Sequence, residues 1–464
     1  MSGRGAAPAR VGADAESVRV SELLAALSFA LDLTEGQPFG HALRSCLIGM
    51  RLAERLDLPV QERRDLYYAM LLKDVGCSSN AARVFELFGG DDRAAKHALK
   101  RVDWTNYLLA ARYAFTQTAP GTSWFHRARR LAALAGSGPR VAAEMVQTRC
   151  TRGAEIVTEL GFGAGPAAAV AALDEHWDGH GQPRGLRREE IPLIARIIGL
   201  AQTVEVFAVI DGVTEALAVA RARRGSWFDP ALVDAVRDLA AEIEQWCTLD
   251  EWGLQEAVRA IEPGEAAVIA GPGTLDRIAR GFAKVVDAKS PFTARHSERM
   301  AEIALDVARA LGLPEREMRD LGRAGLLHDL GKLSVPNVIL DKPGRLSALE
   351  WETVRLHPYY TQRILDRVEG FQELAFVASS HHERLDGRGY FRGLRGAQIP
   401  VGARILAVAD VFEALTSDRP YRPALPFETA LATMERDRGV AFGGDCLEAL
   451  AQVVAESRQD RAAA

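Results

Sequence analysis

The stretch Gly325-Leu-Leu-His-Asp-Leu-Gly-Lys332 sets a histidine beside an aspartate in apolar surroundings. Leucines flank His328 and Asp329 on both sides, in a pattern that predicts an apolar helix. A carboxylate is costly to bury unless a partner compensates its charge, and a metal ion suits a histidine and an aspartate together. A solvated pair at a helix end is the alternative, so the interpretation depends on whether further ligands follow.

Further candidate ligands do follow. The chain has ten histidines, and five of them belong to short motifs of the second half: His296, His328, His357, His381 and His382. Asp410 lies in a segment that is apolar nearly all round, which predicts a buried helix whose carboxylate needs a cation or a strong hydrogen-bond partner. Five imidazoles and two carboxylates are too many for one tetrahedral ion, and they suit two neighbouring metals that share a bridging carboxylate.

The order of these motifs resembles the HD-GYP subgroup of the HD-domain metal-dependent phosphohydrolases. The resemblance covers about residues 275–455 and rests on His328-Asp329, His381-His382-Glu383, Asp386-Gly387 and Gly389-Tyr390. It implies an all-α domain that hydrolyses a cyclic dinucleotide, usually cyclic di-GMP, to linear dinucleotide or GMP in bacterial signalling. Phe292 stands where some members carry a glutamate for a third metal, so we expect two divalent ions, with iron or manganese favoured over zinc.

The resemblance also implies a role for each residue. Asp329 would bridge the metals, with one ion on His296, His328 and Asp410 and the other on His357, His381 and His382. Water activated by the metals would attack phosphorus, which makes Asp329 and Lys332 the expected catalytic residues. The expected substrate-binding residues are Lys332, Tyr390, Arg419 and Arg422.

Each substrate-binding residue also has a plainer interpretation. Lys332 is alternatively a solvated surface lysine, Tyr390 a core aromatic, and the two arginines members of helix-end salt bridges. The third letter of the GYP signature is Phe391 here, which departs from the family and puts partner contacts of that loop in doubt.

The first half repeats the second. His41 precedes His296 by 255 residues, and Lys73 precedes His328 by the same number. Later blocks match at an offset of 208, as in Ile191-Pro-Leu-Ile-Ala-Arg196 and Ile399-Pro-Val-Gly-Ala-Arg404. The first half therefore carries about 47 additional residues, the difference between the offsets, which we place around 83–130.

The first copy has lost ligands. Lys73, Arg149 and Gln202 stand at the positions of His328, His357 and Asp410, while His41 and Asp74 remain and His176 is a further candidate. A lysine and an arginine in place of two histidines repel cations. We therefore expect a metal-free domain that packs against the second half or a second subunit and regulates it. The extra segment offers a contact surface in its aromatic residues, which would otherwise close the first domain's own core: Trp104, Tyr107 and Trp124.

Length and composition fit this organisation. A chain of 464 residues favours two domains. Helical periodicity throughout predicts an all-α fold of two tandem HD-like domains. The expected segments are a disordered tail (1–19), a degenerate HD-like domain (20–257), a linker (258–273) and a complete HD-GYP domain (274–457).

Charge and cysteine usage restrict the partners and the compartment. The net charge of −5 lacks the excess of basic residues that is typical of nucleic-acid-binding proteins. Five cysteines without a CxxC pair indicate reduced thiols. The longest apolar stretch, 191–210, is interrupted by polar residues, so we expect a cytoplasmic protein without a membrane span.

Three functions are compatible with the sequence. The leading one is a phosphodiesterase acting on a cyclic dinucleotide, with a homodimer or a signalling protein as further candidate partners. The alternatives are a regulatory protein that binds nucleotide without turnover and a phosphohydrolase of another nucleotide. The intact ligand set of the second half argues against the regulatory protein, and the His381-His382-Glu383 block argues against the other phosphohydrolase.

Overall fold

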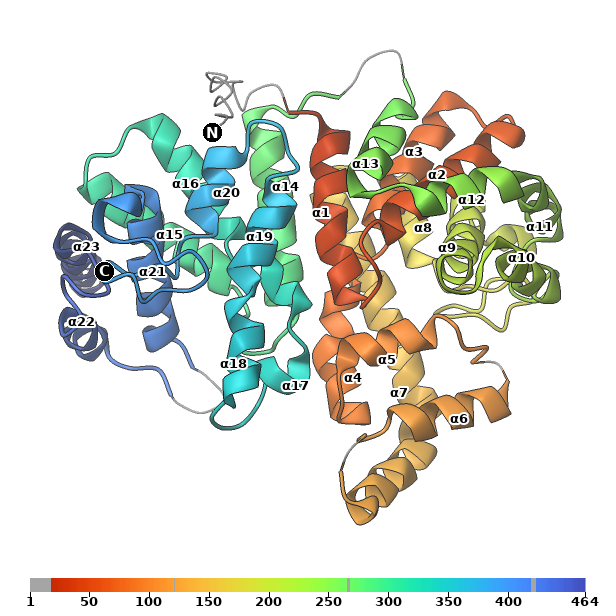
Figure 1. Cartoon of the computed structure of the whole chain (residues 1–464), viewed down its shortest axis with the longest axis horizontal. Helices are drawn as coiled ribbons and strands as arrows, with labels where there is room; N and C mark the ends of the chain where they lie inside the picture. The colour runs from red at the N-terminus through yellow and green to blue at the C-terminus, as the bar shows by residue number, and fades with distance from the viewer. Residues whose placement is uncertain (1–17, 105, 121, 265–267, 419–422, 464) are drawn as a thin grey trace, which may run out of the picture.

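The structure is a computed structural model that describes residues 18–104, 106–120, 122–264, 268–418 and 423–463. Within these ranges the chain forms α-helices and short 3₁₀-helices, labelled η, and no strands beyond isolated bridges. This confirms the predicted all-α fold of two tandem HD-like domains (Figure 1). Arg419 and Arg422 lie outside the described residues.

The first half runs from α1 to α13. Its elements are α1 (Val20–Thr34), α2 (His41–Arg55), α3 (Val60–Leu72), η2 (Cys77–Asn80), α4 (Ala81–Phe88), α5 (Asp92–Leu99), α6 (Tyr107–Gln117), α7 (Trp124–Glu159), α8 (Ala164–Ala171), η3 (Arg188–Glu190), α9 (Leu193–Asp211), α10 (Val213–Ala222), α11 (Pro230–Val236), η4 (Arg237–Leu239), α12 (Ala240–Thr248) and α13 (Glu251–Ala260).

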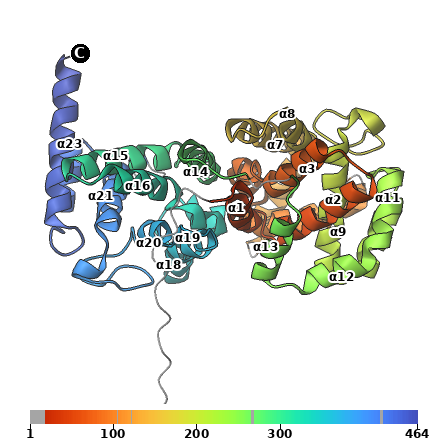
Figure 2. The ribbon, with the colours of Figure 1, turned by 90° about the horizontal axis from the view of Figure 1, so that it is seen from above.

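The second half runs from α14 to α23. Its elements are α14 (Pro272–Asp287), α15 (His296–Ala310), α16 (Glu315–Leu327), η5 (Leu330–Ser334), α17 (Asn337–Leu340), α18 (Ala348–Arg355), α19 (His357–Leu365), α20 (Gln372–Ala378), η6 (Gly396–Gln398), α21 (Val401–Thr416), α22 (Phe427–Glu435) and α23 (Gly444–Ala463). The last helix projects away from the body of the protein (Figure 2).

The internal repeat is visible in the helix boundaries. Helices α3 and α16 begin and end 255 residues apart, and η3 and η6 begin and end 208 residues apart. The additional residues of the first half form α4, α5, α6 and the beginning of α7, in the place where the second half has the single turn of α17. The extra segment therefore interrupts the first copy directly after η2.

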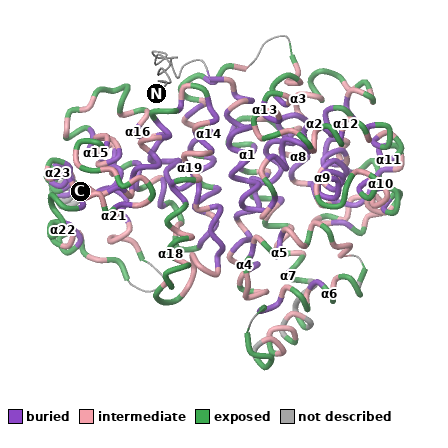
Figure 3. Tube along the Cα trace, in the orientation of Figure 1, coloured by how far each residue is buried: buried purple, intermediate pink, exposed green. Residues whose placement is uncertain are grey.

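The two halves pack reciprocally around α1 and α14. Helix α1 contacts η5 and α19 of the second half, while its counterpart α14 contacts η2 and α7 of the first. Helix α1 is apolar nearly all round, and within it Glu22 alone is not buried. Buried residues accordingly run through α1 and α14 at the centre of the molecule, where one connected core spans both halves (Figure 3).

The segment between the halves differs slightly from the prediction. Helix α13 continues to Ala260, so the linker begins later than 258. Val18 and Arg19, expected in the tail, are ordered because this segment pairs with the linker: the backbone of Val18 accepts a hydrogen bond from Ala270 at 2.8 Å. Residues 1–17 of the predicted tail lie outside the described part of the chain.

Helix α9 has the length and apolar composition of a membrane span. Two-thirds of its apolar window is buried inside the protein, however, and the helix packs against α2 and α10. A core helix passes the same test of length and hydropathy.

Candidate metal centre

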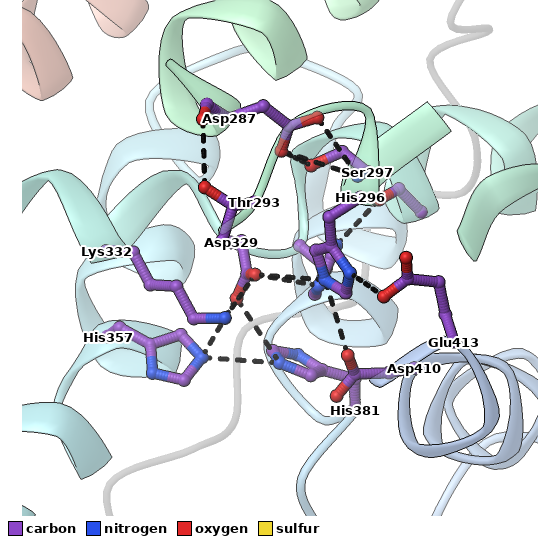
Figure 4. A network of polar contacts seen from close by, with 12 residues as sticks. Asp287, Thr293, His296, Ser297, Asp329, Lys332, His357, His381, Asp410 and Glu413 are labelled. Atoms are coloured by element: carbon purple, nitrogen blue, oxygen red, sulfur yellow. Dashed lines mark hydrogen bonds and ion pairs between the residues drawn. The ribbon is translucent and has the colours of Figure 1, made fainter. Parts of the chain in front are cut away.

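The seven predicted ligands come together from five separate segments of the second half. His296 begins α15, His357 begins α19, and Asp410 lies within the buried helix α21. His328 follows the last residue of α16 and Asp329 precedes η5, so the pair occupies a helix junction and not the interior of an apolar helix. His381 and His382 follow α20. Figure 4 shows most of these side chains pointing toward one another.

Glycine and threonine make the junction possible. A Cβ on Gly331 would lie 1.9 Å from the backbone oxygen of His357, so only glycine lets η5 approach the start of α19 this closely. The hydroxyl of Thr361 accepts a hydrogen bond from the Gly331 backbone and donates one to the His328 carbonyl, each at 2.9 Å. These contacts hold Asp329 beside the first turn of α19.

The candidate ligand atoms fall into two main groups whose members lie within 4.8 Å of one another: His296, His328 and Asp410 form one, and His357, His381 and His382 the other. The grouping coincides with the two predicted shells. Asp329 lies between them, with Oδ2 3.1 Å from Nε2 of His328 and Oδ1 3.3 Å from Nε2 of His357. Its carboxylate therefore faces both groups, as a bridge would.

Three imidazoles are held by the backbone. The Nδ1 atoms of His328, His357 and His381 lie 2.7, 2.7 and 2.6 Å from the carbonyl oxygen of the residue three positions earlier. A carbonyl can only accept, so Nδ1 carries the proton and Nε2 presents its lone pair to the centre.

His296 is held by a carboxylate instead. Its Nδ1 lies 2.5 Å from Oε2 of Glu413, and Nη2 of Arg299 lies 2.9 Å from the other carboxylate oxygen. Glu413 was not among the residues predicted from the sequence. The available signal was its position one turn after Asp410 on the same apolar helix, where a second buried carboxylate also needs a partner.

The protonation states suit ligands. Burial lowers the pKa of His357, lowers that of His381 far below its ordinary value, and lowers the pKa of His382 to about 3, so these imidazoles are neutral. Burial alone would raise the pKa of Asp329, but His328 and Lys332 beside it hold this pKa well below the usual range.

Carboxylates surround His296 and make this side of the centre negative. Burial would raise the pKa of Asp410, yet His296, whose Nε2 lies 3.4 Å from its Oδ1, keeps this pKa well below the usual range. Burial would lower the pKa of His296, but the surrounding carboxylates of Asp329, Asp410 and Glu413 raise it well above the ordinary value. The carboxylates thus draw a positive charge to this point.

The residues present fit metal ions. Nε2 of His296, Nε2 of His328 and Oδ1 of Asp329 are buried and meet no hydrogen-bond partner within the described part of the chain. Buried polar atoms without partners are rare unless they serve a ligand. Nitrogen and oxygen donors of this kind suit divalent transition metals.

Lys332 and Tyr390 border the centre. Nζ of Lys332 forms an ion pair with Oδ2 of Asp329, and its side chain keeps 22% of its exposure, so it is neither a free surface lysine nor buried. The Tyr390 ring lies 4.4 Å from the His382 ring, with the Arg355 guanidinium 5.2 Å from its centroid. Both residues reach the accessible side of the histidine cluster.

Glu383, the third residue of the His-His-Glu block, holds a loop. Its two carboxylate oxygens accept hydrogen bonds from the backbone of Arg392 at 3.1 Å and of Leu394 at 2.9 Å. A Cβ on Gly389 would lie 2.6 Å from the Cα of Glu383, which explains a glycine there. Phe391 is 39% exposed and packs on Tyr359, with ring centroids 5.9 Å apart.

Comparison with known proteins identifies the family. The HD-domain profile matches residues 139–232 and 281–445, one segment in each half. The chain belongs to the HD-domain family. This confirms the membership that the motifs of the second half predicted.

Two of the comparisons cover nearly the whole of this HD-domain chain, and a third covers part of it. The 3'3'-cGAMP-specific phosphodiesterase 3 of Vibrio cholerae serotype O1 is 43% identical over 431 residues, 93% of this chain and 94% of the relative. The crystal structure of a cyclic GMP-AMP specific phosphodiesterase of V. cholerae (V-cGAP3) has a TM-score of 0.66 at 38% identity, covering 94% of this chain and 98% of that one. The cyclic di-GMP phosphodiesterase response regulator RpfG of Xanthomonas campestris is 41% identical over 188 residues, 40% of this chain and 49% of RpfG.

The HD-like site of the first half keeps the frame of the second. Nδ1 of His41 contacts Glu205, which also pairs with Nε of Arg44 at 2.6 Å, as His296, Glu413 and Arg299 do in the second half. Asp32 accepts hydrogen bonds from the backbone of Gly40 and Ala42 at 2.8 and 3.1 Å, just as Asp287 holds the start of α15. The scaffold is therefore retained around the changed residues.

Two ammonium groups lie where the second HD domain collects imidazoles. Nζ of Lys73 lies 2.9 Å from Nε2 of His41 and contacts Asp74. Nζ of Lys100 lies 3.3 Å from the same Nε2, 3.6 Å from Asp74 and 3.2 Å from Glu35. Lys100 follows α5 of the extra segment and was not predicted.

One position of the predicted correspondence was wrong. At the offset of 208, His176 matches Arg384, and the counterparts of His381 and His382 are Leu173 and Asp174. Asp174 pairs with Arg149, and the His176 ring stacks on Trp227 at 4.0 Å and faces Trp104 at 4.9 Å. His176 is therefore part of an aromatic stack, and Trp104 closes the first domain's own interior.

Proposed function

We propose that the second half hydrolyses a phosphodiester bond of a cyclic dinucleotide, with 3'3'-cGAMP preferred over cyclic di-GMP. The observation that carries the proposal is the pair of histidine-rich groups that face one another across Asp329. Such a geometry suits a binuclear phosphodiesterase. The HD-domain relatives described above carry phosphodiesterase names.

The proposed substrate preference rests on how much of this chain each relative aligns with. The relative that aligns with both halves of this chain is named as specific for 3'3'-cGAMP, whereas RpfG, named for cyclic di-GMP, aligns with 40% of the chain. Cyclic di-GMP, the substrate expected from the motifs alone, is the second candidate, favoured by the 41% identity of that segment to RpfG.

We further propose two metals, iron or manganese, on the shells predicted from the sequence. His296, His328 and Asp410 would hold one ion, and His357, His381 and His382 the other, with Asp329 between them. Phe292 brings no third carboxylate to the site. When bound, such ions lower the pKa of water and neutralise charge on phosphoryl oxygens.

The chain's own residues would position the metal ligands and supply positive charge for the phosphate. The backbone carbonyls fix the Nε2 atoms of His328, His357 and His381, so the ligand geometry exists before a substrate arrives. The ammonium of Lys332 lies at the accessible edge beside Asp329, where it suits a phosphate oxygen whose negative charge grows during attack. Tyr390 offers a ring face to a base. Arg419 and Arg422 stay in the proposal as phosphate or base contacts on sequence grounds alone.

The test is hydrolysis by the full-length protein, purified anaerobically and loaded with Mn²⁺ or Fe²⁺. We expect 3'3'-cGAMP to be cleaved with a higher kcat/KM than cyclic di-GMP. Chromatography of the linear dinucleotide and mononucleotide products measures both rates. Equal or reversed kcat/KM values would overturn the preference. Tight binding of both dinucleotides without any product, in protein with full metal content, would favour the non-catalytic alternative.

A further inference from the structure

The extra segment of the first half reaches the hydrolytic half. Asp92, at the start of α5, is fully buried against the segment that follows η5. Its Oδ1 accepts a hydrogen bond from the backbone N–H of Asn337 at 2.7 Å, and its Oδ2 lies 3.4 Å from Nζ of Lys289. A carboxylate of the half without the ligand set is thus enclosed by the half that has it.

Asp92 joins two segments that are distant in sequence. Lys289 follows α14, and Asn337 begins α17. The Asn337 side-chain amide donates to the Lys289 carbonyl and to Asp341, each at 2.7 Å. The neighbouring Arg93 donates to the Ser334 carbonyl at the end of η5. The start of α5 therefore holds the end of η5 and the loop after α14 against each other.

These two segments lead directly to the metal centre. The loop after α14 ends at His296, and Asp287 at its beginning holds the backbone N–H of Ser297 at 3.1 Å (Figure 4). The turn η5 follows Asp329 and carries Lys332. A shift of either segment relative to the other would change the separation of His296 and Asp329, in which Nε2 lies 3.5 Å from Oδ2.

The charge of Asp92 also has a specific partner. Lys289 is buried, and burial lowers its pKa to about 8 while Asp92 opposes the shift. Without the carboxylate, the buried ammonium would lose its counter-charge, and the lysine would deprotonate or move toward solvent. Movement of Lys289 would disturb the loop that ends at His296.

We propose that Asp92 is a positioning residue for the hydrolytic centre, contributed by the half that lacks the ligand set. It acts through Lys289 and Asn337, and it touches neither metal ligands nor the accessible edge of the site. The activity part of this inference rests on the proposed function, whereas its metal-binding part does not. The extra segment thereby makes the first half a component of the second half's active site.

The test compares variants of the full-length protein in Mn²⁺ affinity, kcat and KM. Asp92→Ala is expected to weaken Mn²⁺ binding and lower kcat about tenfold or more, as loss of groups that orient ligands does, while KM changes little. Asp92→Asn keeps an acceptor for the Asn337 N–H and is expected to lose less. Adding Lys289→Met to Asp92→Asn should recover part of that loss, because the uncompensated charge is gone.

The matched control is Glu251→Gln. Glu251 also joins the halves, pairing with Arg363 at 2.6 Å and with Arg367, but at the end of α19 remote from His357. We expect the control to lower the thermal midpoint while Mn²⁺ affinity and kcat stay close to wild type. Equal effects of Asp92→Ala and Glu251→Gln on Mn²⁺ affinity, or none from Asp92→Asn, would overturn the inference. A wild-type protein that binds Mn²⁺ and cleaves no dinucleotide would contradict the proposed function alone, since the Mn²⁺ comparison would still decide the role of Asp92.

Discussion

The two halves hold an equivalent buried aspartate in the same surrounding contacts, but they compensate its charge in different ways. In the second half, Asp329 lies between imidazoles whose Nε2 atoms face the centre. In the first half, its counterpart Asp74 lies between the ammonium groups of Lys73 and Lys100. A buried carboxylate needs a cation in either case. Covalently attached lysines supply it permanently, whereas imidazoles leave the place to an exchangeable ion.

The largest expected effect is loss of hydrolysis when Asp329, rather than its counterpart Asp74, is replaced. Asp329→Ala removes the oxygen atoms that face both ligand groups, so hydrolysis should fall about a thousandfold or more and metal content should drop. Elemental analysis and turnover of the purified variant check this. Wild-type turnover by Asp329→Ala would show that the centre does not act through a shared carboxylate.

Replacing the counterpart carboxylate, Asp74, in the first half should lower stability and leave hydrolysis to the second half. Asp74→Ala leaves Lys73 and Lys100 without their shared carboxylate in a buried site, which should cost about 3–5 kcal/mol of unfolding free energy. Metal content should remain that of the wild type, because none of the proposed ligands changes. Denaturant unfolding and elemental analysis of the same sample measure both. A loss of metal from Asp74→Ala with unchanged stability would reverse the comparison.

The next effect is a pH dependence of stability that comes from His176 in the first half. Burial lowers the pKa of His176 to about 4, below the value of about 6.5 in an unfolded chain. The unfolded state therefore binds more protons, and stability is lost as the pH falls from about 6.5 toward 4. His176→Phe keeps the ring between Trp104 and Trp227 and removes the titration, so the loss between pH 7 and pH 5 should shrink by about 1–2 kcal/mol.

The measurement is the urea midpoint at both pH values for wild type and variant. The pKa of His41 is also lowered to about 4, first by burial and then by Lys73, so some loss should remain in His176→Phe. An unchanged pH dependence would show that His176 does not contribute to the acid sensitivity of the first half.

The smallest effect concerns the residue before the first ligand. Arg295 adopts φ of 61°, and its counterpart Gly40 adopts φ of 88°. A Cβ on Gly40 would lie 2.6 Å from Cδ1 of Leu254, whereas the Arg295 side chain is largely exposed. Gly40→Ala should thus cost about 1–2 kcal/mol, and Arg295→Gly should change stability by less than about 1 kcal/mol. Thermal unfolding of both variants tests whether the two turns differ in this way.

The cluster of candidate ligands could be predicted from the sequence because its residue types and their order are specific. Five histidines and two aspartates in short motifs left few other uses for such side chains, and the structure places six of them in the two expected groups, with Asp329 between the groups. The roles of individual atoms were less accessible. Glu383 is part of the motif but holds the backbone of Arg392 and Leu394, a contact that depends on the loop's path.

What the sequence could not show involves residues without a counterpart in the repeat. Lys100 and Asp92 belong to the extra segment, and alignment of one half on the other gives no position for them. His176 was misplaced because a histidine near the matching block looked like a retained ligand, although the offset of 208 assigns it to Arg384. Glu413 carries no distinguishing signal of its own in the sequence, because a glutamate on a helix is usually solvated. Long-range packing decided all of these.

The backbone contacts of the three histidines bear on how fast metals enter and leave. The rings of His328, His357 and His381 are fixed by carbonyl acceptors of the backbone. Ordering a long side chain costs up to about 1–2 kcal/mol of conformational entropy, and this cost is met during folding. Capture of an ion then requires little further ordering of these three rings. Metal exchange should accordingly be limited by dehydration of the ion and by access past Lys332 and Tyr390, and not by a search among side-chain rotamers.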